Sequence, residues 1–570
     1  MSHPVPAVEA LLAIYGAPDA CADELLCDSH NPSDVAFTVV EADLSAEDIT
    51  YGELRERSER GAAALAELGV GPGDAVATLM GKSADLVVML LAIWRRGAVH
   101  VPLFTAFAWP AIELRLTASG AKVVITDANQ REKIQETVAA VVVAGDEASP
   151  PDLALTPLLA RQQPGIAAAA VGGDGALVLI FTSGTTGAPK GVPVPVRALA
   201  AFRQYVGLGL DVSEEDVFWN AADPGWAYGL YYGILGPMAA GRRNLLLRPG
   251  FSPELSFKVL EAFSVTNFAA APTVYRTMRA KADAGTGPFH LRRASSAGEP
   301  LTPEVIGWAR EVLGVPVRDH YGQTEHGMMI INAWHDDVRT ELRPGSMGRP
   351  LPGWSCAVLK DNADEPAAPG ELGRVAVNVA GSPMMWFTGY QDAPEKTAER
   401  FSTDGKWYLT GDAGMVDQDG YYYFSSRDDD VIIMAGYRIG PFDVESVLST
   451  HPAVLESAVV GAPDELRGEV LEAYVVLADG TTGSDALVAE LQAMVKTQFA
   501  AHAYPRRIHF VQDLPKTPSG KLQRYILRQQ RAADGGIPGG KDGVGISDGA
   551  APNTFEPEED PDAAAGADDD

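Results

Sequence analysis

Short apolar segments alternate with amphipathic segments in the first half of the chain, and this alternation limits the fold more than any other feature of the sequence. Asp74–Met80 and Ala121–Thr126 are predicted strands, and Tyr51–Leu68 and Leu86–Arg95 are predicted helices. A further strand is predicted at Ala176–Phe181. Strands that alternate with helices at this spacing indicate an α/β fold with largely parallel sheets, in which ligand-binding loops follow the carboxyl ends of the strands.

The pattern changes from about Gly345 onward. Short β segments with Gly and Asp turns follow at Gly373–Val379, Trp407–Thr410 and Gly420–Phe424. They predict an antiparallel barrel or sheet that completes the large domain. After the charged stretch Arg427–Asp430, a small α+β module is predicted from Val444–Ser449, Ala458–Gly461 and Ala473–Leu477. We therefore expect a large N-terminal domain at residues 1–428, a small C-terminal domain at 429–534 and a tail at 535–570.

Acidic residues dominate the charge of the chain, which has 570 residues and a net charge of −31. Such a chain repels nucleic acid and anionic membrane surfaces, so neither is an expected partner. Residues 535–570 contain ten acidic residues and one Lys among Gly, Ala and Pro. This composition is typical of a disordered tail, and both a passive tail and a regulatory or docking tail stay open.

Cysteine content and apolar run length bear on where the protein resides. Three Cys form a sparse, odd set, which fits a reducing compartment rather than a disulfide framework. The longest apolar run, Leu86–Trp94, has nine residues, whereas a membrane-spanning helix needs about 20. The N-terminus lacks the basic and apolar regions of a signal peptide. We expect a cytoplasmic protein without membrane insertion.

A loop rich in Gly and hydroxyl residues follows the strand Ala176–Phe181 and reads TSGTTGAPKG. Its glycines let backbone N–H groups turn toward an anion, while its hydroxyls and its Lys add donors and positive charge. It is not a Walker loop, because Pro precedes the Lys and Gly follows it. The alternative is a flexible surface loop. The candidate phosphate-binding residues are Thr182, Ser183, Gly184, Thr185, Thr186, Gly187 and Lys190.

This loop resembles the signature loop of the AMP-forming adenylating enzymes, which include acyl-CoA synthetases, firefly luciferases and peptide-synthetase adenylation domains. Further segments resemble the family's motifs in the expected order: SAGEP at Ser296–Pro300, DHYGQTEHG at Asp319–Gly327, YLTGD at Tyr408–Asp412 and PKTPSGKLQR at Pro515–Arg524. The resemblance runs from about Tyr51 to Arg531 and is greatest to acetyl-CoA and medium-chain acyl-CoA synthetases. It implies parallel α/β sheets with a small β-barrel-like subdomain, followed by a small mobile α+β domain.

The resemblance implies an ATP site in the large domain. Tyr321 would stack on adenine, and Thr324 would hydrogen-bond the α-phosphate. Glu325 would hold Mg²⁺, a cation that prefers carboxylate and phosphate oxygens. The backbone of Gly298, Glu299 and Pro300 would line the base. The remaining residues implied for the nucleotide are Asp319, His320, Gly322 and Gln323.

The resemblance also assigns the ribose and the catalytic cation. A carboxylate can accept two hydrogen bonds from a cis-diol, which suits Asp412, and Arg427 would face the same ribose. Lys521 matches the catalytic Lys, whose ammonium would stabilise the charge that develops as a carboxylate attacks the α-phosphate of ATP. The order of the motifs supports these assignments. Without it, Asp412 would be interpreted as a turn residue, Arg427 as a member of a solvated charge run and Lys521 as a surface lysine.

The segment Met434–Glu445 resembles the part of the family that serves the second half-reaction. Gly436 and Tyr437 would line the tunnel for the pantetheine arm of CoA, where a Gly leaves room for the thiol. Arg438 would neutralise a phosphate, and Asp429 corresponds to the hinge about which the small domain rotates. A simple β-turn is the alternative for Gly436.

The implied co-substrates of the carboxylic acid are ATP with Mg²⁺, and CoA, and the implied intermediate is an acyl-adenylate. In acetate-specific relatives a Trp caps the acyl pocket directly after the first aromatic residue of the motif, whereas this chain has Gly322 there. Trp226 and Ala227 are expected to line the same pocket. The small residues Gly322 and Ala227 together favour a propionyl-sized to medium-chain, branched or aromatic acid.

Other functions stay open. One is an adenylation enzyme that loads a carrier protein, although no carrier domain with a modifiable Ser is visible. Another is a non-catalytic nucleotide-binding sensor, against which Lys521, Glu325 and Asp412 argue. A third is a luciferase-like oxygenase. The sequence leaves monomer and homo-oligomer open. It also leaves open control of Lys521 by an acetyltransferase and a deacetylase, since acetylation would remove its charge.

Overall fold

The computed structural model describes residues 5–135, 139–182, 189–281, 287–434, 437–464, 468–500, 503–517 and 521–533. The chain forms two compact units, a large unit (Met1–Asp428) and a small unit (Asp429–Asp570). The acidic tail predicted at 535–570 lies outside the described residues. In the described part of the chain, no helix has both the length and the apolar character needed to cross a membrane.

A seven-stranded sheet forms one layer of the large unit, in the order β7-β6-β5-β3-β4-β8-β9. All neighbouring strands are parallel except β8 with β9. The strands are β3 (Ala75–Leu79), β4 (Val99–Pro102), β5 (Val123–Thr126), β6 (Ala140–Val143), β7 (Leu153–Ala154), β8 (Ala176–Thr182) and β9 (Lys190–Pro195). The strands predicted in this region are confirmed as β3, β5 and β8.

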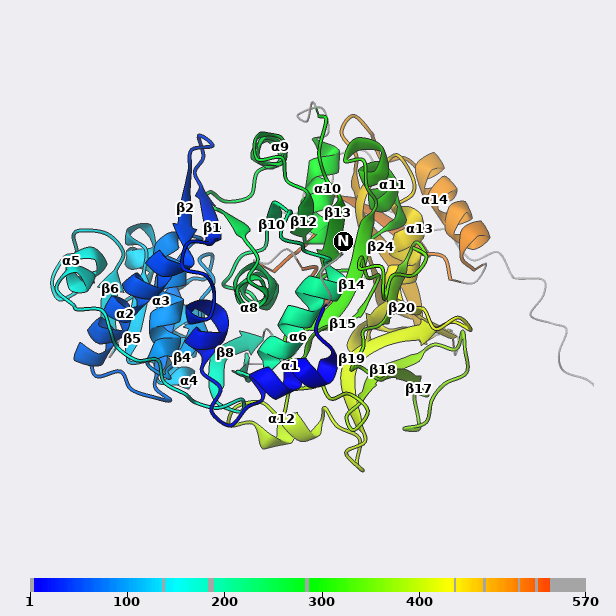
Figure 1. Ribbon diagram of the computed structural model, residues 1–570. Helices are drawn as coiled ribbons and strands as arrows, with labels where there is room; N and C mark the ends of the chain where they lie inside the picture. Colours follow the sequence, from blue (N-terminus) through cyan, green and yellow to red (C-terminus); the bar gives the residue numbers. More distant parts are fainter. Residues whose placement is uncertain are drawn as a thin grey trace, which may run out of the picture. The chain divides into compact units, whose positions relative to one another are not determined.

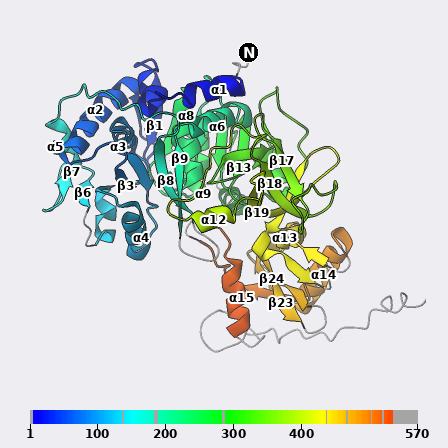
Figure 2. The ribbon, with the colours of Figure 1, turned by 90° about the horizontal axis from the view of Figure 1, so that it is seen from below.

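Helices cover both faces of this sheet, which explains why its strands are almost continuously apolar. Val123 and Ile125 of β5 share a core with α2, α3 and α5, whereas Val124 packs with α4 on the opposite face. Figure 2 shows α2 and α3 on one side of β3 and α4 on the other. The helices are α2 (Tyr51–Glu67), α3 (Ala84–Arg95), α4 (Trp109–Ser119), α5 (Leu155–Ala160) and the 3₁₀ helix η2 (Ala128–Lys133).

A thirteen-stranded sheet forms the second layer, in the order β17-β18-β19-β20-β16-β15-β14-β13-β12-β10-β11-β1-β2. The strands from β14 to β1 in this order are parallel, and both flanks are antiparallel. The β segments predicted after Gly345 therefore extend the large sheet through β16. The strands are β1 (Val35–Val40), β2 (Ala46–Thr50), β10 (Phe218–Asn220), β11 (Asn244–Leu247), β12 (Asn267–Ala270), β13 (Arg293–Ala297), β14 (Val317–Gln323), β15 (Gly327–Ile331), β16 (Ser346–Pro350), β17 (Cys356–Leu359), β18 (Gly373–Asn378), β19 (Trp407–Val416) and β20 (Tyr422–Arg427).

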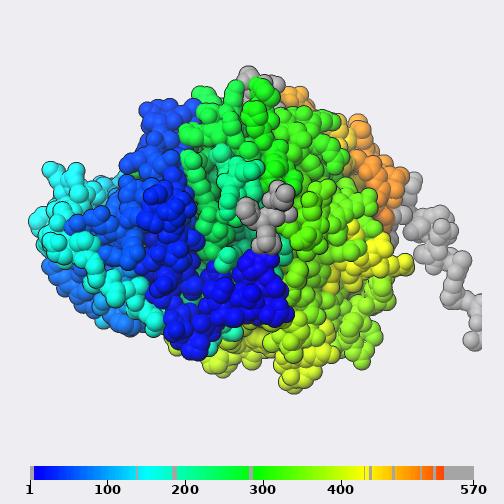
Figure 3. All heavy atoms as spheres, viewed as in Figure 1, coloured from blue at the N-terminus to red at the C-terminus, as the bar shows by residue number. Residues whose placement is uncertain are grey.

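Helices also cover the parallel part of the second sheet. One face packs against α9 (Pro253–Ala262), α10 (Pro272–Ala280) and α11 (Pro303–Val312), which lie together in Figure 1. The other face shares an apolar core with the first sheet through α6 (Ala198–Gln204), η3 (Tyr205–Gly209), η4 (Tyr231–Leu235) and α8 (Gly236–Ala240). The helix α1 (Val8–Tyr15) packs on α6 and lies at the surface in Figure 3. The remaining short helices are η1 (Glu24–Asp28), α7 (Ala227–Leu230) and α12 (Pro394–Ala398).

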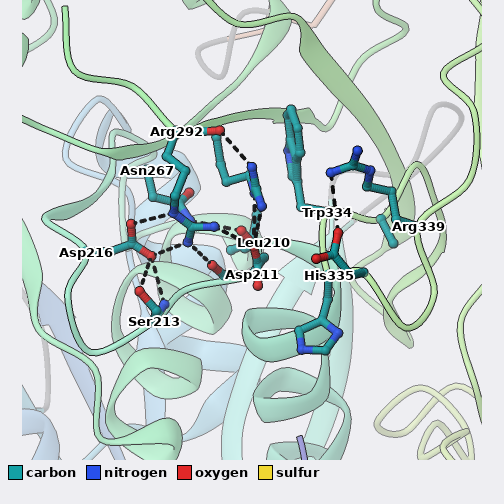
Figure 4. Close-up of polar contacts among 12 residues, drawn as sticks. Leu210, Asp211, Ser213, Asp216, Asn267, Arg292, Trp334, His335 and Arg339 are labelled. Atoms are coloured by element: carbon teal, nitrogen blue, oxygen red, sulfur yellow. Dashed lines mark hydrogen bonds and ion pairs between the residues drawn. The ribbon is translucent and has the colours of Figure 1, made fainter. Parts of the chain in front are cut away.

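An ion-pair cluster holds the amino ends of β10, β12 and β13 together (Figure 4). Arg292, just before β13, donates from Nη2 to Asp216 Oδ2 at 2.5 Å and from Nη1 to Asp211 Oδ2 at 2.5 Å. Asn267, the first residue of β12, donates from Nδ2 to the carbonyl oxygen of Leu210 at 2.9 Å. Because these contacts fix the amino ends of the strands, the carboxyl ends form a defined edge for the loops that follow them.

The small unit is an α+β structure built on five strands, in the order β22-β21-β24-β23 with β25 paired to β24. The strands are β21 (Ile432–Met434), β22 (Tyr437–Ile439), β23 (Val454–Asp464), β24 (Gly468–Leu477) and β25 (Arg507–Val511). The helices are α13 (Pro441–Leu448), α14 (Asp485–Gln498) and α15 (Arg524–Ala533), and the 3₁₀ turn η6 (Asp428–Asp430) precedes β21. Leu448 of α13 and Leu491 of α14 share a core with Ala473 of β24.

Candidate active site

The candidate site lies at the carboxyl ends of β13 and β14, which are parallel neighbours. Residues 298–300 follow β13 directly, and β14 carries residues 319–323. Ala297 pairs with His320 in the sheet register, so the two predicted adenine-site segments lie side by side. Gly298 has a φ of +101°, a conformation that favours Gly, so the chain can turn at the end of β13.

Asp412 is the centre of a buried hydrogen-bond network. Tyr321 donates its hydroxyl to Asp412 Oδ2 at 2.5 Å, and Gln323 donates from Nε2 to the same oxygen at 2.7 Å. Arg427 donates from Nη1 to Asp412 Oδ1 at 2.8 Å. The Asp412 side chain is 4% exposed. Since each carboxylate oxygen has about two acceptor positions, Oδ2 is saturated and Oδ1 can accept one more hydrogen bond.

The β19–β20 ladder sets this geometry, because Asp412 and Arg427 are register partners. Gly411, just before Asp412, has a φ of +71°, and a Cβ there would lie 2.5 Å from Arg400 Nη1. A larger residue at this position would push Arg400 away. Burial and the negative charge of Asp412 raise the pKa of Tyr321, so its hydroxyl stays protonated and remains a donor.

Tyr390 joins the predicted metal ligand to two cations. Its hydroxyl donates to Glu325 Oε1 at 2.8 Å and accepts from Arg400 Nε at 3.2 Å. Lys190 Nζ lies 5.0 Å from the centre of the Tyr390 ring. Burial and the neighbouring Arg400 lower the pKa of Lys190. One carboxylate and two cations therefore gather around a single phenol ring, an arrangement suited to a phosphate group and its cation.

The donor set around Glu325 fits a cation that arrives with a phosphate ligand. Glu325 is buried, and the described residues contain no group of three His, Cys, Asp or Glu side chains that would hold a resident metal ion. Mg²⁺ is commonly bound by one or two carboxylates together with substrate phosphates. The single carboxylate of Glu325 is compatible with a site of this kind.

His320 fixes β14 in the core. The carbonyl oxygen of Asn332 lies 3.1 Å from His320 Nε2 and can only accept, so Nε2 carries the proton and Nδ1 accepts from the Tyr205 hydroxyl at 2.7 Å. Burial lowers the pKa of His320 to about 3, which agrees with this neutral ring. Burial also raises the pKa of the adjacent Asp319 to about 8. Both side chains belong to the scaffold behind the predicted adenine site.

The Glu299 side chain is held by α10. Arg276 donates from Nη2 to Glu299 Oε2 at 2.6 Å, and Thr273 donates its hydroxyl to Oε1 at 2.8 Å. Both oxygens of this carboxylate are therefore engaged by side chains of α10.

The predicted acyl-pocket residues lie at the start of α7. Trp226 packs against Phe104 and Phe107, with ring centroids 5.1 and 5.6 Å away. Ala227 is the first residue of α7 and is half-buried. These rings form an apolar wall between the first sheet and α7.

Gly322 has no room for a side chain. A Cβ there would lie 2.2 Å from the carbonyl oxygen of Gly327 and 2.7 Å from Met328 Cα. The register between β14 and β15 shifts at this point, between Tyr321 and Gly322. The backbone of β15 therefore excludes a side chain at this position.

Part of the predicted phosphate loop can be placed. Thr182 ends β8 and pairs in register with Lys190, which begins β9. Ser183, Gly184, Thr185, Thr186 and Gly187 lie outside the described residues. The antiparallel β8–β9 pair therefore brings the two ends of the loop together, next to Tyr390.

The remaining predicted residues belong to the small unit. Tyr437 and Arg438 lie in β22, and Gly436 lies outside the described residues. Asp429 lies in the turn η6, at the first residue of the small unit. Lys521 lies just before α15, and its backbone N–H donates to Thr517 Oγ1 at 3.0 Å.

Tyr390 and Arg400 were not among the predicted residues. Both come from the segment around α12, far in sequence from Glu325. Arg400 lies in an ordinary charged stretch, EKTAERF, and nothing local separates it from a solvated arginine. Only the fold brings these two side chains to the site.

Comparisons with protein families agree with the motifs. A family model described as AMP-binding enzyme matches residues 28–390, and one described as AMP-binding enzyme C-terminal domain matches residues 443–521. The acetyl-coenzyme A synthetase of Bacillus subtilis (strain 168) is 37% identical over 492 residues, which cover 85% of each chain. The mitochondrial acyl-coenzyme A synthetase ACSM3 of Mus musculus is 34% identical over 477 residues, which cover 80% of each chain.

Solved structures of similar fold give the same result. The acyl-CoA synthetase of Brucella canis is 42% identical with a TM-score of 0.72, covering 93% of this chain and 97% of that one. The anthranilate CoA ligase AuaEII, solved in complex with anthranoyl-AMP, is 27% identical with a TM-score of 0.83, covering 91% of this chain and 99% of that one. The chain therefore belongs to the AMP-binding enzyme family and is an AMP-forming acyl-CoA synthetase of the adenylating superfamily.

Proposed function

We propose that this enzyme activates a short- to medium-chain, branched or aromatic carboxylic acid as its acyl-adenylate and then transfers the acyl group to CoA. The observation that carries the proposal is the pair of adjacent networks around Asp412 and Glu325. The first offers acceptor oxygens suited to a ribose, and the second offers a carboxylate beside two cations, suited to a phosphate and its cation.

In the first half-reaction the carboxylate of the acid attacks the α-phosphate of ATP, and pyrophosphate leaves. Lys190 and the loop at 183–188 hold the β- and γ-phosphates. Glu325 would hold Mg²⁺, which would neutralise charge on the phosphate oxygens. Thr324 donates to the α-phosphate. Tyr390 and Arg400 keep the Glu325 carboxylate in place through the hydrogen bonds at 2.8 and 3.2 Å.

Binding of the ribose at Asp412 requires an exchange of hydrogen bonds. Oδ2 already accepts from Tyr321 and Gln323, so a cis-diol that uses both oxygens replaces at least one of these donors. Tyr321 is then free to stack on adenine, next to the backbone of residues 298–300. Arg427 stays on Oδ1 and orients the carboxylate.

The small unit supplies the remaining groups. Lys521 stabilises the charge on the α-phosphate and the attacking carboxylate during adenylation. In the second half-reaction the small unit rotates about Asp429, the tunnel of Gly436 and Tyr437 admits the pantetheine arm, and Arg438 meets a phosphate of CoA. The thiol then attacks the acyl-adenylate, and AMP leaves.

Two features support an acid larger than acetate. The position after Tyr321 carries Gly322 instead of the Trp that caps the pocket in acetate-specific relatives, and Ala227 is small. The names of similar proteins span acetate, for the Bacillus subtilis relative, and anthranilate, for the solved ligase. Each further methylene buried in such a pocket contributes about 0.8 kcal/mol, so the preferred acid should show rising kcat/KM with chain length until the pocket is filled.

One assay tests this function. Purified protein with MgATP, CoA and a panel of C2–C10 and aromatic acids is expected to release AMP in proportion to acyl-CoA. AMP release that does not need CoA supports a carrier-loading enzyme instead, absence of AMP with every acid supports a sensor, and oxygen consumption supports an oxygenase.

Lys521→Ala tests whether Lys521 acts in adenylation and not in thioester formation. We expect adenylation to fall by about 10²- to 10³-fold, the usual cost of removing one group that stabilises developing charge. Thioester formation from supplied acyl-adenylate and CoA should stay near the wild-type rate. An equal loss in both half-reactions would contradict the role proposed for Lys521.

A further inference from the structure

Lys521 lies in a short antiparallel hairpin of the small unit, in which residues 515–517 pair with residues 521–523. Thr517 donates its backbone N–H to the carbonyl oxygen of Lys521 at 2.7 Å, and Gln523 donates its backbone N–H to that of Pro515 at 2.9 Å. Lys516 and Leu522 form a β-bridge between these contacts. The hairpin runs directly into α15, whose first residue is Arg524. The position of Lys521 is therefore set by whatever holds the start of this helix.

Arg524 holds the start of α15 through two carboxylates. Its Nη2 donates to Glu445 Oε2 at 2.6 Å and Oε1 at 2.7 Å, and its Nη1 lies 3.5 Å from Asp430 Oδ2. Arg528, one turn further along, donates from Nη1 to Asp430 Oδ1 at 2.7 Å. Asp430 and Glu445 are only 12% and 9% exposed. Two arginines of α15 thus meet the last residue of the turn that contains Asp429.

Glu445 ties the same cluster to the core of the small unit. It belongs to α13, and its Oε1 also accepts from the backbone N–H of Val459 in β23 at 2.7 Å. Arg524 therefore connects three separate parts of the unit: the turn at the proposed hinge, the β23–α13 core and the Lys521 hairpin.

We infer that Arg524 is a positioning residue for Lys521, which makes the proposed hinge and the catalytic hairpin move as one body. This inference rests on the role proposed for Lys521. A planar guanidinium can hold Glu445 through two hydrogen bonds while it faces Asp430, whereas a lysine ammonium holds neither geometry. The adenylation step needs Lys521 at a fixed place, and the thioester step does not use it.

Arg524→Lys is the first test, because it keeps the charge and removes the planar fork. We expect adenylation, measured by acid-dependent ATP–pyrophosphate exchange, to fall by about 100-fold, the usual effect of a displacement of about 1 Å. Thioester formation from supplied acyl-adenylate should stay within about twofold of wild type. Hydrogen exchange of peptides from 430–434 and 515–523 should accelerate together.

Arg531→Lys is the matched control. Arg531 lies on the same helix and donates from Nε and Nη2 to Glu472 at 2.8 and 3.0 Å, but this pair does not touch Asp430 or Glu445. An equal loss of adenylation in Arg531→Lys and Arg524→Lys would overturn the inference, since it would reflect general stability of the unit.

Asp430→Asn covers the case in which Arg524→Lys fails to fold, because Glu445 still neutralises Arg524 in this variant. It should show the same preferential loss of adenylation. Equal rates of adenylation in Asp430→Asn and wild type would refute the proposed coupling between the hinge turn and the Lys521 hairpin. Failure of Lys521→Ala to separate the half-reactions would instead refute the proposed function, so the two failures are distinguishable.

Discussion

Replacement of Tyr390 by Phe removes one oxygen from the site and little else. The ring stays in its buried position, and Lys190 still faces it at 5.0 Å. The change deletes the hydrogen bond from the hydroxyl to Glu325 Oε1 at 2.8 Å and the one that the hydroxyl accepts from Arg400 at 3.2 Å. Glu325 keeps its charge but loses the group that orients it.

The expected size of the effect follows from this contact. A hydrogen bond to a charged group contributes about 1.5–3 kcal/mol, and about 1.4 kcal/mol corresponds to tenfold in rate. We expect kcat/KM for MgATP in adenylation to fall by about 10- to 150-fold. The Mg²⁺ concentration for half-maximal rate should rise, because a misaligned carboxylate binds the cation less well. The KM for the acid should not change.

The assay combines Mg²⁺ titrations of ATP–pyrophosphate exchange with calorimetry of a non-hydrolysable ATP analogue at fixed Mg²⁺. Tyr423→Phe is the control, because the Tyr423 hydroxyl donates to the carboxylate of Asp417 at 3.2 Å, outside the site. A Tyr390→Phe enzyme with a wild-type Mg²⁺ titration would refute the argument, as would an equal loss in Tyr423→Phe.

Two further outcomes test the scaffold. Gly322→Ala should destabilise the large unit by about 1–3 kcal/mol in urea titrations, because its Cβ would lie 2.2 Å from the carbonyl oxygen of Gly327. Gly307→Ala in α11 is the control and should be neutral or stabilising, because a Cβ there meets open space. Burial alone would raise the pKa of Glu472, but hydrogen bonds from His509 and Arg531 outweigh it and lower this pKa to about 2, from 4.5. The stability that the Glu472 carboxylate contributes is therefore complete above pH 4.5 and is lost as the pH falls toward 2. About 2 kcal/mol should be gone by pH 3, and Glu472→Gln should flatten this dependence in urea titrations that follow hydrogen exchange of β24.

The alternation of apolar strands and helices predicts most of the large unit because burial on both sides leaves a clear pattern. The predicted strand Ala121–Thr126 appears as β5 (Val123–Thr126), and the helix Tyr51–Leu68 appears as α2 (Tyr51–Glu67). The sequence could not predict that the β segments after Gly345 join the large sheet. That continuity depends on β16 pairing with both β15 and β20, and such long-range partners leave no local pattern.

The candidate site shows the same difference between residues with a local sequence pattern and residues that only the fold brings together. Motif residues such as Asp412 and Arg427 are found from sequence because short spacings and residue types carry the chemistry, and the β19–β20 ladder pairs these two in register. Tyr390 and Arg400 could not be predicted from sequence, since their place in the site depends on tertiary contacts: Tyr390 contacts Glu325, and Arg400 contacts Tyr390. The motif of Glu299 assigns its backbone to the adenine and says nothing of its side chain, which binds Arg276. The contact between His320 and Tyr205 is likewise visible only in the fold.

The two edges of the thirteen-stranded sheet differ in how their polar groups are paired, and this difference agrees with the place proposed for the nucleotide. At the amino edge, Asp216 is 3% exposed and held by Arg292, so exchange of partners would leave a buried charge at a cost of several kcal/mol. At the carboxyl edge, the partners of Asp412 include two neutral donors, Tyr321 and Gln323, which a ribose hydroxyl can replace one for one. Because such an exchange adds few hydrogen bonds in total, the Asp412 contact should contribute more to selection of the ribose than to affinity for ATP.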